Sequence, residues 1–280
     1  MLGYVDVGGG ERGAYGAGVL DACLESGITF DYFAGVSAGA ANIVSFLAGQ
    51  KGRNYRFYTE YSFRSRYMGL QALMHSGSYF DLEYIYGELS NSGGEDPLDY
   101  PAMSASGKRG CIVATDAGTG LPVYFDLREM RQDDYGAVKA SSCIPVLARA
   151  YRWRGRKLYD GGISDPIPFA KCFEQGCDRV VVVLTRPKDA RRDPKKDAGF
   201  ARLLSVTHPA AAKALKARAQ TYNRELEEAL RLEEEGKILI VAPADIGGMR
   251  TLTRDPEAIR RMYRAGCEDG RAIRPFLETA

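Results

Sequence analysis

Residues 30–42 have the sequence Phe-Asp-Tyr-Phe-Ala-Gly-Val-Ser-Ala-Gly-Ala-Ala-Asn, with the pattern Gly-x-Ser-x-Gly at Gly35, Ser37 and Gly39. An apolar run precedes the pattern and an Ala-rich run follows it, which predicts a strand, a sharp turn and a helix. Such a turn exposes the serine hydroxyl and leaves no room for a Cβ at either glycine. We therefore predict that Ser37 is a nucleophile and that the Ala38 N–H faces the negative charge on an attacked carbonyl. Because the pattern is short, a serine in an ordinary glycine-rich loop is the alternative.

The composition is that of a soluble globular chain. Its 280 residues are 45% hydrophobic and 26% charged, which is ample for a sizeable core. The net charge of +2 gives no reason to expect nucleic-acid binding. The six cysteines do not have the spacing of zinc ligands, and we expect them to be reduced thiols. We expect no signal peptide, and no apolar run approaches the ~18–20 residues of a spanning helix. We expect a cytoplasmic protein, with peripheral contact at the inner face of the membrane left open.

Short apolar runs alternate with segments of helical spacing along most of the chain. Strands are expected at residues 4–7, 28–36, 110–116, 121–126, 152–159, 179–185 and 237–241, and helices at 14–24, 38–48, 134–140, 169–174, 210–235 and 256–271. The run 179–185 is β-branched without alternation, which is typical of a strand buried on both faces. The order of elements predicts a three-layer α/β fold with a largely parallel sheet.

Two stretches differ from this pattern. Residues 186–196 form a charged loop and are the best candidate for a boundary, which divides the chain into a core at 1–186 and a mostly helical extension at 187–280 packed on that core. Residues 51–80 are dense in aromatic side chains and methionine. They predict helices packed on the core or, alternatively, part of the wall or lid of an acyl-binding cleft.

The loop Gly8–Gly13, with the sequence GGGERG, has two functional interpretations. It fits Gly-x-Gly-x-x-Gly between a strand and a helix, as in a dinucleotide-binding turn, and Asp31 about 20 residues further on would then bind the ribose. That match is weakened because Asp31 enters the next strand instead of ending one. The other interpretation is an oxyanion hole, since consecutive glycines leave backbone N–H groups unshielded. A tight strand-to-helix turn is compatible with both.

A third motif, Asp160-Gly161-Gly162, places a carboxylate before two residues without side chains, although Asp-Gly is also a common turn dipeptide. Four motifs then follow one another: Gly-Gly-Gly-x-Arg-Gly at 8–13, Gly-x-Ser-x-Gly at 35–39, Ala-Ser-Ser-Cys-Ile-Pro at 140–145 and Asp-Gly-Gly at 160–162. In this order and spacing they resemble the patatin-like phospholipase family, over about residues 3–186.

The resemblance implies a three-layer α/β/α sandwich that hydrolyses lipid acyl esters with a Ser–Asp dyad. It makes Ser37 the nucleophile and Asp160 its base. It also implies roles for the motif residues: an oxyanion loop of Gly8, Gly9 and Gly10 with Arg12 as its brace, and close-packed glycines at Gly35, Gly39, Gly161 and Gly162. One departure is Val7, where family members often carry an acidic or polar residue; Asp6 comes one position earlier and receives no role.

We therefore expect a serine hydrolase of the phospholipase A or lysophospholipase type. No metal or cofactor is expected, the substrate is a lipid acyl ester, and no nucleic acid is involved. The alternatives are a nucleotide-binding oxidoreductase built on the loop 8–13 and a catalytically silent lipid-binding protein. No oligomeric state is predicted.

The chain contains only two histidines, His75 and His208. Ser37, Asp160 and His208 stand in the chain order of an α/β-hydrolase triad, which makes His208 the rival base. His208 lies at the approach to a long helix, where a capping or surface position is expected, and His75 lies among the aromatic residues. We expect the dyad to work without either histidine.

Overall fold

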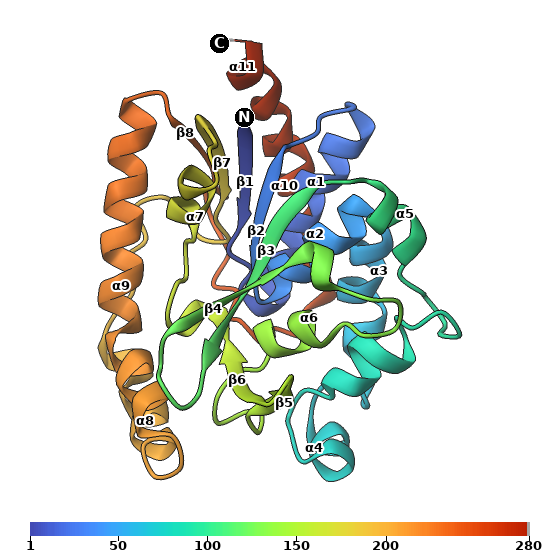
Figure 1. Cartoon of the computed structure of the whole chain (residues 1–280), viewed down its shortest axis with the longest axis vertical. Coiled ribbons are helices and arrows are strands. Elements are labelled where there is room, and N and C mark those ends of the chain that lie inside the picture. Colours follow the sequence, from blue (N-terminus) through green and yellow to red (C-terminus); the bar gives the residue numbers. More distant parts are fainter. Residues whose placement is uncertain (279–280) are drawn as a thin grey trace.

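The protein is built around one mixed sheet (Figure 1). The computed structural model describes residues 1–278, and within them the sheet has eight strands in the order β5-β6-β3-β2-β1-β7-β8, with β4 paired to β3 off this path. The strands are β1 (Leu2–Asp6), β2 (Tyr32–Val36), β3 (Arg109–Asp116), β4 (Pro122–Asp126), β5 (Tyr151–Trp153), β6 (Arg156–Asp160), β7 (Arg179–Val183) and β8 (Ile238–Val241). The pairs from β3 through β2, β1 and β7 to β8 are all parallel, whereas β4 and β6 run antiparallel to β3.

Helices cover both faces of the sheet. Figure 1 shows α1, α2 and α10 on one side and α7 and α9 on the other. The helices are α1 (Ala14–Glu25), α2 (Ala38–Leu47), α3 (Arg53–Thr59), α4 (Leu70–Ser76), α5 (Tyr100–Ala105), α6 (Gly136–Ser141), α7 (Phe169–Glu174), α8 (Lys195–Leu204), α9 (Pro209–Glu234), α10 (Pro256–Asp269) and α11 (Ile273–Glu278). The predicted three-layer α/β/α sandwich with a mostly parallel sheet is confirmed.

The hydrophobic core lies on both faces of the sheet. Val181 and Val183 of β7 pack in the cluster beneath α1, α2 and α10, whereas Val180 and Val182 pack in the cluster beneath α7 and α9. Since both faces are covered, every position of this strand after Arg179 is valine, with no alternation of apolar and polar residues. The burial explains the unalternating run found in the sequence.

The order in which the chain adds strands to the sheet reverses at β1. From β1 the chain passes through α1 to β2 on one side, while β7 pairs with the other side of β1. In sheets of this type the crevice at such a switch point, beyond the carboxyl ends of the strands, is where ligands bind. The loop that begins at Gly8 follows the end of β1, and Ser37 follows the end of β2.

A second feature of the sheet concerns β3, which has eight residues and is longer than its neighbour β2. β2 pairs with Arg109–Val113 of β3, and the antiparallel β6 pairs with residues 114–116. Since β4 occupies the opposite edge over 111–115, β2 and β6 lie end to end along one edge. The carboxyl ends of β2 and β6 therefore meet, and the residues that follow them are neighbours.

Some local expectations were wrong in detail. The expected single extended segment 152–159 is a hairpin of β5 and β6, because Arg154 and Gly155 both have positive φ, 47° and 74°, as a two-residue hairpin turn requires. Residues 28–31 precede β2 without joining it, and the charged loop 186–196 runs into the helix α8. Residues 51–80 form α3, α4 and irregular turns.

The segment from residue 187 onward meets the preceding part of the chain closely. β8 pairs in parallel with β7 and extends the same sheet. α10 packs so tightly on α1 that a Cβ on Gly266 would lie 2.0 Å from the carbonyl oxygen of Tyr15. The division at residue 186 stays a prediction. No helix among the described residues combines the length and apolar character needed to cross a membrane.

Candidate active site

The predicted sharp turn is present at the end of β2. Ser37 has φ 56° and ψ −130°, a backbone conformation that is rare for a residue with a side chain. A Cβ on Gly35 would lie 2.7 Å from the Cα of Ala40, and one on Gly39 would lie 2.3 Å from the carbonyl oxygen of Asp6. Both positions therefore require glycine, as the pattern predicts. Ser37 also precedes the first turn of α2, so the Ala38 N–H lies at the positive end of that helix.

A serine on a distant helix holds this turn in place. The backbone N–H of Ser37 donates a hydrogen bond of 2.7 Å to Oγ of Ser141, and the Ser141 hydroxyl donates one of 2.6 Å to the carbonyl oxygen of Val113. Ser141 therefore links the strained turn to β3. Ser141 belongs to the motif 140–145, but the motif alone does not predict this contact.

Asp160 ends β6 and lies beside Ser37. Its carboxylate accepts a hydrogen bond of 2.8 Å from the Gly162 N–H. Burial raises the pKa of Asp160, while the Arg218 charge, the nearby Ser37 side chain and the Gly162 N–H oppose the rise. A Cβ on Gly161 would lie 2.2 Å from the Val113 carbonyl oxygen, so only glycine lets this segment approach β3 so closely. The arrangement places a hydroxyl and a carboxylate of raised basicity in the same cavity.

The glycine loop packs directly on the serine turn. Gly8, Gly9 and Gly10 have φ of 62°, 128° and 60°, and a Cβ on Gly8 would lie 2.3 Å from the Val36 carbonyl oxygen. The Gly8 N–H donates to Oδ1 of Asp6 at 2.9 Å. Within residues 1–278 no group accepts a hydrogen bond from the N–H of Gly9 or Gly10. Of the three predicted donors, Gly8 is thus already occupied, and the other two remain free for a ligand.

Asp6, for which the sequence motifs predict no role, lies at the end of β1 beside the glycine loop. It is fully buried, and besides the Gly8 N–H it accepts a 3.0 Å hydrogen bond from Nδ2 of Asn42 on α2. Burial raises the pKa of Asp6 to about 6. The carboxylate thereby ties the glycine loop to the helix behind Ser37. The sequence does contain a signal for this role, because an aspartate within a buried strand, two residues before Gly8, needs hydrogen-bond partners nearby.

Arg12, the predicted brace, lies behind the glycine loop. It is 4% exposed, and its Nη1 donates a 3.2 Å hydrogen bond to Oγ1 of Thr251. Burial, together with the nearby charge of Arg186, lowers the pKa of Arg12 to about 10. Arg12 therefore connects the loop to the C-terminal part of the chain.

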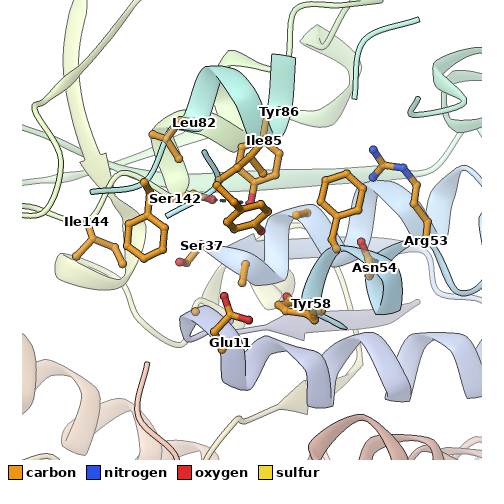
Figure 2. A pocket seen from close by; sticks show the side chains of 16 residues that line it. Glu11, Ser37, Arg53, Asn54, Tyr58, Leu82, Ile85, Tyr86, Ser142 and Ile144 are labelled. Atoms are coloured by element: carbon orange, nitrogen blue, oxygen red, sulfur yellow. Dashed lines mark hydrogen bonds between the residues drawn. The ribbon is translucent and has the colours of Figure 1, made fainter. Parts of the chain in front are cut away.

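Two cavities meet at Ser37. The first, of about 60 Å³, is drawn in Figure 2 and is enclosed largely by aromatic and aliphatic side chains, among them Phe57, Tyr58, Phe80, Leu82 and Ile85. Several come from the aromatic-rich stretch 51–80, which accordingly serves both as packed core and as cavity wall. The second cavity, of about 320 Å³, contains Asp160 and the glycine loop and is lined by many cationic side chains. Ser37 thus separates an apolar cavity from a cationic one.

One buried acid lies inside the apolar cavity. Glu11, 3% exposed, lines it opposite Tyr86 (Figure 2), and its Oε2 has no hydrogen-bond partner among the described residues. Burial raises the pKa of Glu11 to about 8, so the side chain is largely neutral at pH 7. A neutral acid is compatible with an apolar cavity.

The rival residues lie elsewhere. His208 precedes α9, its Nδ1 lies 3.0 Å from Oγ1 of Thr207, and no histidine lines the cavity that contains Ser37 and Asp160. His75 on α4 contacts Asp81, with 3.0 Å between Nδ1 and Oδ2. Asp31 accepts a hydrogen bond from the Leu2 N–H, at the opposite end of β1 from the glycine loop. Asp31 therefore lies too far from the glycine loop to bind the ribose of a nucleotide held there.

The described residues contain no group of three or more His, Cys, Asp or Glu side chains placed to hold a metal ion. All six cysteines are free.

Known proteins resemble this chain in two regions. A patatin-like phospholipase family model matches residues 7–172, and a model for a domain of unknown function, DUF6363, matches residues 208–278. YjjU of Escherichia coli K12 is 30% identical over 193 residues, which are 67% of this chain and 53% of YjjU. An NTE family protein of Mycobacterium tuberculosis H37Rv is 27% identical over 195 residues, 68% of this chain and 50% of that protein. The chain spans about half the length of the curated relatives it matches.

Among solved structures, VipD from Legionella pneumophila aligns with a TM-score of 0.47 at 16% identity, covering 99% of this chain and 66% of that chain.

Proposed function

Because this chain belongs to the patatin-like phospholipase family, we propose that it hydrolyses acyl ester bonds of lipids with Ser37 as nucleophile and Asp160 as its base. The observation that carries the proposal is the pairing at the ends of β2 and β6. A serine in a strained turn lies close enough to a buried carboxylate to influence its pKa, and the same cavity is lined by glycines whose backbone N–H groups have no partner among the described residues. Nucleophile, base and oxyanion donors are the parts that acyl transfer requires.

In the first step Oγ of Ser37 attacks the ester carbonyl carbon while Asp160 takes the hydroxyl proton. The carbonyl oxygen becomes an alkoxide, for which the N–H groups of Gly9, Gly10 and Ala38 are the proposed donors. Collapse of the tetrahedral intermediate breaks the bond to the leaving alcohol, which receives the proton from Asp160. The acyl group stays on Ser37 as an ester.

In the second step water repeats the sequence. Asp160 takes a proton from water, the hydroxide attacks the acyl-enzyme, and Ser37 leaves with the returned proton. A free aspartate, with a pKa of ~3.9, is a weak base for this work at neutral pH. The burial that raises the pKa of Asp160 improves the match and supports its role as base.

We also propose that the ester is met at a lipid surface. Large apolar side chains are exposed on two helices at the lower end of Figure 1, Leu70 and Met74 on α4 and Phe200 and Leu203 on α8. Met74 is 81% exposed and Leu203 is 62% exposed, which is unusual for side chains of this size. Phe200 also lines the cationic cavity, so the exposed apolar residues of α8 adjoin the proposed site.

The test compares wild-type protein with Ser37→Ala on p-nitrophenyl butyrate and on micellar lysophospholipid. We expect Ser37→Ala to lose both activities and to melt at the wild-type temperature, whereas Ser104→Ala, which changes an exposed serine on α5, keeps both. Met74→Ser should lower the ratio of micellar to soluble-ester activity. A folded Ser37→Ala protein that still hydrolyses esters at the wild-type rate would refute the nucleophile, and equal rates on monomeric and micellar substrate would refute the interface.

A further inference from the structure

The larger cavity at Ser37 collects arginines from three separate parts of the chain. Arg12 follows the glycine loop, Arg186 and Arg192 belong to the loop after β7, and Arg218 lies on α9. Together with Lys196 they line the cavity that contains Ser37 and Asp160. Only Arg12 belongs to one of the three sequence motifs. The other three arginines come after residue 185, so the motifs do not explain why four arginines lie around one cavity.

These guanidinium groups are poorly compensated. Among residues 1–278 their one ion pair joins Nη1 of Arg218 to Oδ1 of Asp197 at 3.7 Å. The Nε atoms of Arg12 and Arg218 are buried without a hydrogen-bond partner in the described chain. Besides Asp197, only Asp160 supplies a carboxylate to the cavity, so cations outnumber anions there. Arg12 is buried and the other three arginines are half-buried, and an excess of such unpaired positive charge is costly unless an anion neutralises it.

The arginines also repel one another. Burial, and then the charges of Arg218 and Arg186, lower the pKa of Arg192 to about 9. The loop nevertheless fixes Arg192 on α9. Its backbone N–H donates to Oδ1 of Asn223 at 2.8 Å, its carbonyl accepts from Nδ2 of Asn223 at 3.0 Å, and its guanidinium lies 5.3 Å from the ring centre of Tyr222. The positive charges are thus held together by the fold.

We propose that Arg192, Arg218 and Arg186 bind the phosphate of an anionic phospholipid head group and so place its acyl ester at Ser37. Planar guanidinium groups match phosphate oxygens with paired hydrogen bonds, which are strong when partly buried. A choline or ethanolamine head group would add an ammonium to a cavity already rich in cations. The site therefore favours head groups without an ammonium, such as phosphoglycerol or a phosphomonoester. This assignment rests on the proposed function and names the substrate class of the same site.

The apolar cavity on the other side of Ser37 completes the arrangement. Its Phe57, Leu82 and Ile85 suit an acyl chain, while the arginines suit a phosphate. The ester between chain and head group would then lie at Ser37, where the two cavities meet. The arginine cluster orients the substrate and leaves the chemistry to Ser37 and Asp160.

The experiment measures a ratio within each protein. Lysophosphatidylglycerol and lysophosphatidylcholine with the same acyl chain are compared by kcat/KM for wild type, Arg192→Gln, Arg218→Gln and the control Arg224→Gln, which changes an exposed arginine on α9 outside the cavity. We expect wild type and Arg224→Gln to prefer the anionic lipid by about tenfold or more, the effect of a hydrogen bond to a charged group. In Arg192→Gln and Arg218→Gln the ratio should fall toward one. A general loss of activity or stability cancels in this ratio.

Three results would overturn or relocate the proposal. A wild-type ratio near one, with Ser37-dependent hydrolysis of both lipids, overturns the head-group site and leaves the proposed function standing. Absence of Ser37-dependent hydrolysis of any ester, including p-nitrophenyl butyrate, refutes the proposed function itself. Inorganic phosphate is titrated into Ser37→Ala protein as a separate arm. Binding that Arg192→Gln abolishes, combined with a lipid ratio near one, would make the cluster a site for free phosphate and overturn the head-group assignment.

Discussion

At the scale of single residues, the proposed mechanism makes the pKa of Asp160 the property that sets the pH dependence of activity. A general base must be ionised, so activity is lost as the pH falls through the pKa of Asp160. Burial raises that pKa, and the positive charge of Arg218 opposes the rise. We therefore predict that kcat/KM for p-nitrophenyl butyrate has an acidic limb above pH ~4, the region of a free aspartate.

Arg218→Gln removes a charge that lowers the pKa of Asp160, so the acidic limb should move to higher pH. The pH profiles of Arg218→Gln and of the exposed control Arg224→Gln are to be compared with wild type. A limb that stays in place, or that moves to lower pH, in Arg218→Gln would contradict Asp160 as the titrating base.

The histidines provide a second prediction at this scale. His208→Ala and His75→Ala should each keep most of the activity, since neither side chain lines the cavity of Ser37 and Asp160. Asp160→Asn should lose nearly all of it, because an amide keeps the size but cannot take a proton. Steady-state rates on p-nitrophenyl butyrate, with circular dichroism as the check on folding, decide the matter. An inactive but folded His208→Ala protein would indicate a Ser–His–Asp triad.

At the scale of elements, the contact between the glycine loop and the serine turn is rigid. A Cβ on Gly8 would lie 2.3 Å from a backbone oxygen of β2, and backbone cannot move aside as a side chain can. Gly107 has the same φ of 62° but nothing within 4 Å of its Cβ position, which makes Gly107→Ala a matched control for backbone strain. We predict that Gly8→Ala lowers the free energy of unfolding by about 1–3 kcal/mol more than Gly107→Ala does. The melting temperature of Gly8→Ala should therefore be the lower of the two. Equal melting temperatures would mean that the loop can move away from β2.

The same elements show what a sequence can predict. The turn at Ser37, the glycine loop and the buried strand β7 have local signals, namely glycine spacing and unalternating β-branched residues, and each was placed correctly. The hairpin of β5 and β6 was missed because its turn, Arg154-Gly155, lacks the usual Asn-Gly or Asp-Gly pair. α8 was missed because Lys195 and Lys196 at its start continue the charged loop before it.

The supporting contacts of the site depend on tertiary structure. Ser141 reaches Ser37 across 104 positions of sequence, and Asp6 reaches Asn42 across 36. No pattern within a helix or a strand encodes such a contact. The cationic cavity has the same origin, since Arg12 and Arg218 become neighbours only when α9 covers the sheet.

At the scale of the whole molecule, the part after residue 186 is bound into the core. A Cβ on Gly266 of α10 would lie 2.0 Å from the backbone of α1, whereas Gly199 of α8 has nothing within 4 Å. We predict that Gly266→Ala lowers the melting temperature by several degrees and that Gly199→Ala, also within a helix, does not. A protein truncated at residue 186 should fail to melt cooperatively, because it exposes β7 and one face of α1. Cooperative melting of residues 1–186 alone would instead establish them as an independent domain.

The most direct test of the central claim is to map the site of a fluorophosphonate adduct by mass spectrometry. A fluorophosphonate phosphonylates a serine, with loss of fluoride, only where a base and oxyanion donors activate it. We predict one adduct, on Ser37, absent from Ser37→Ala and formed ~10²-fold or more slowly in Asp160→Asn. An adduct on another serine, or hydrolysis of esters by a protein that the reagent does not label, would contradict the Ser37–Asp160 site.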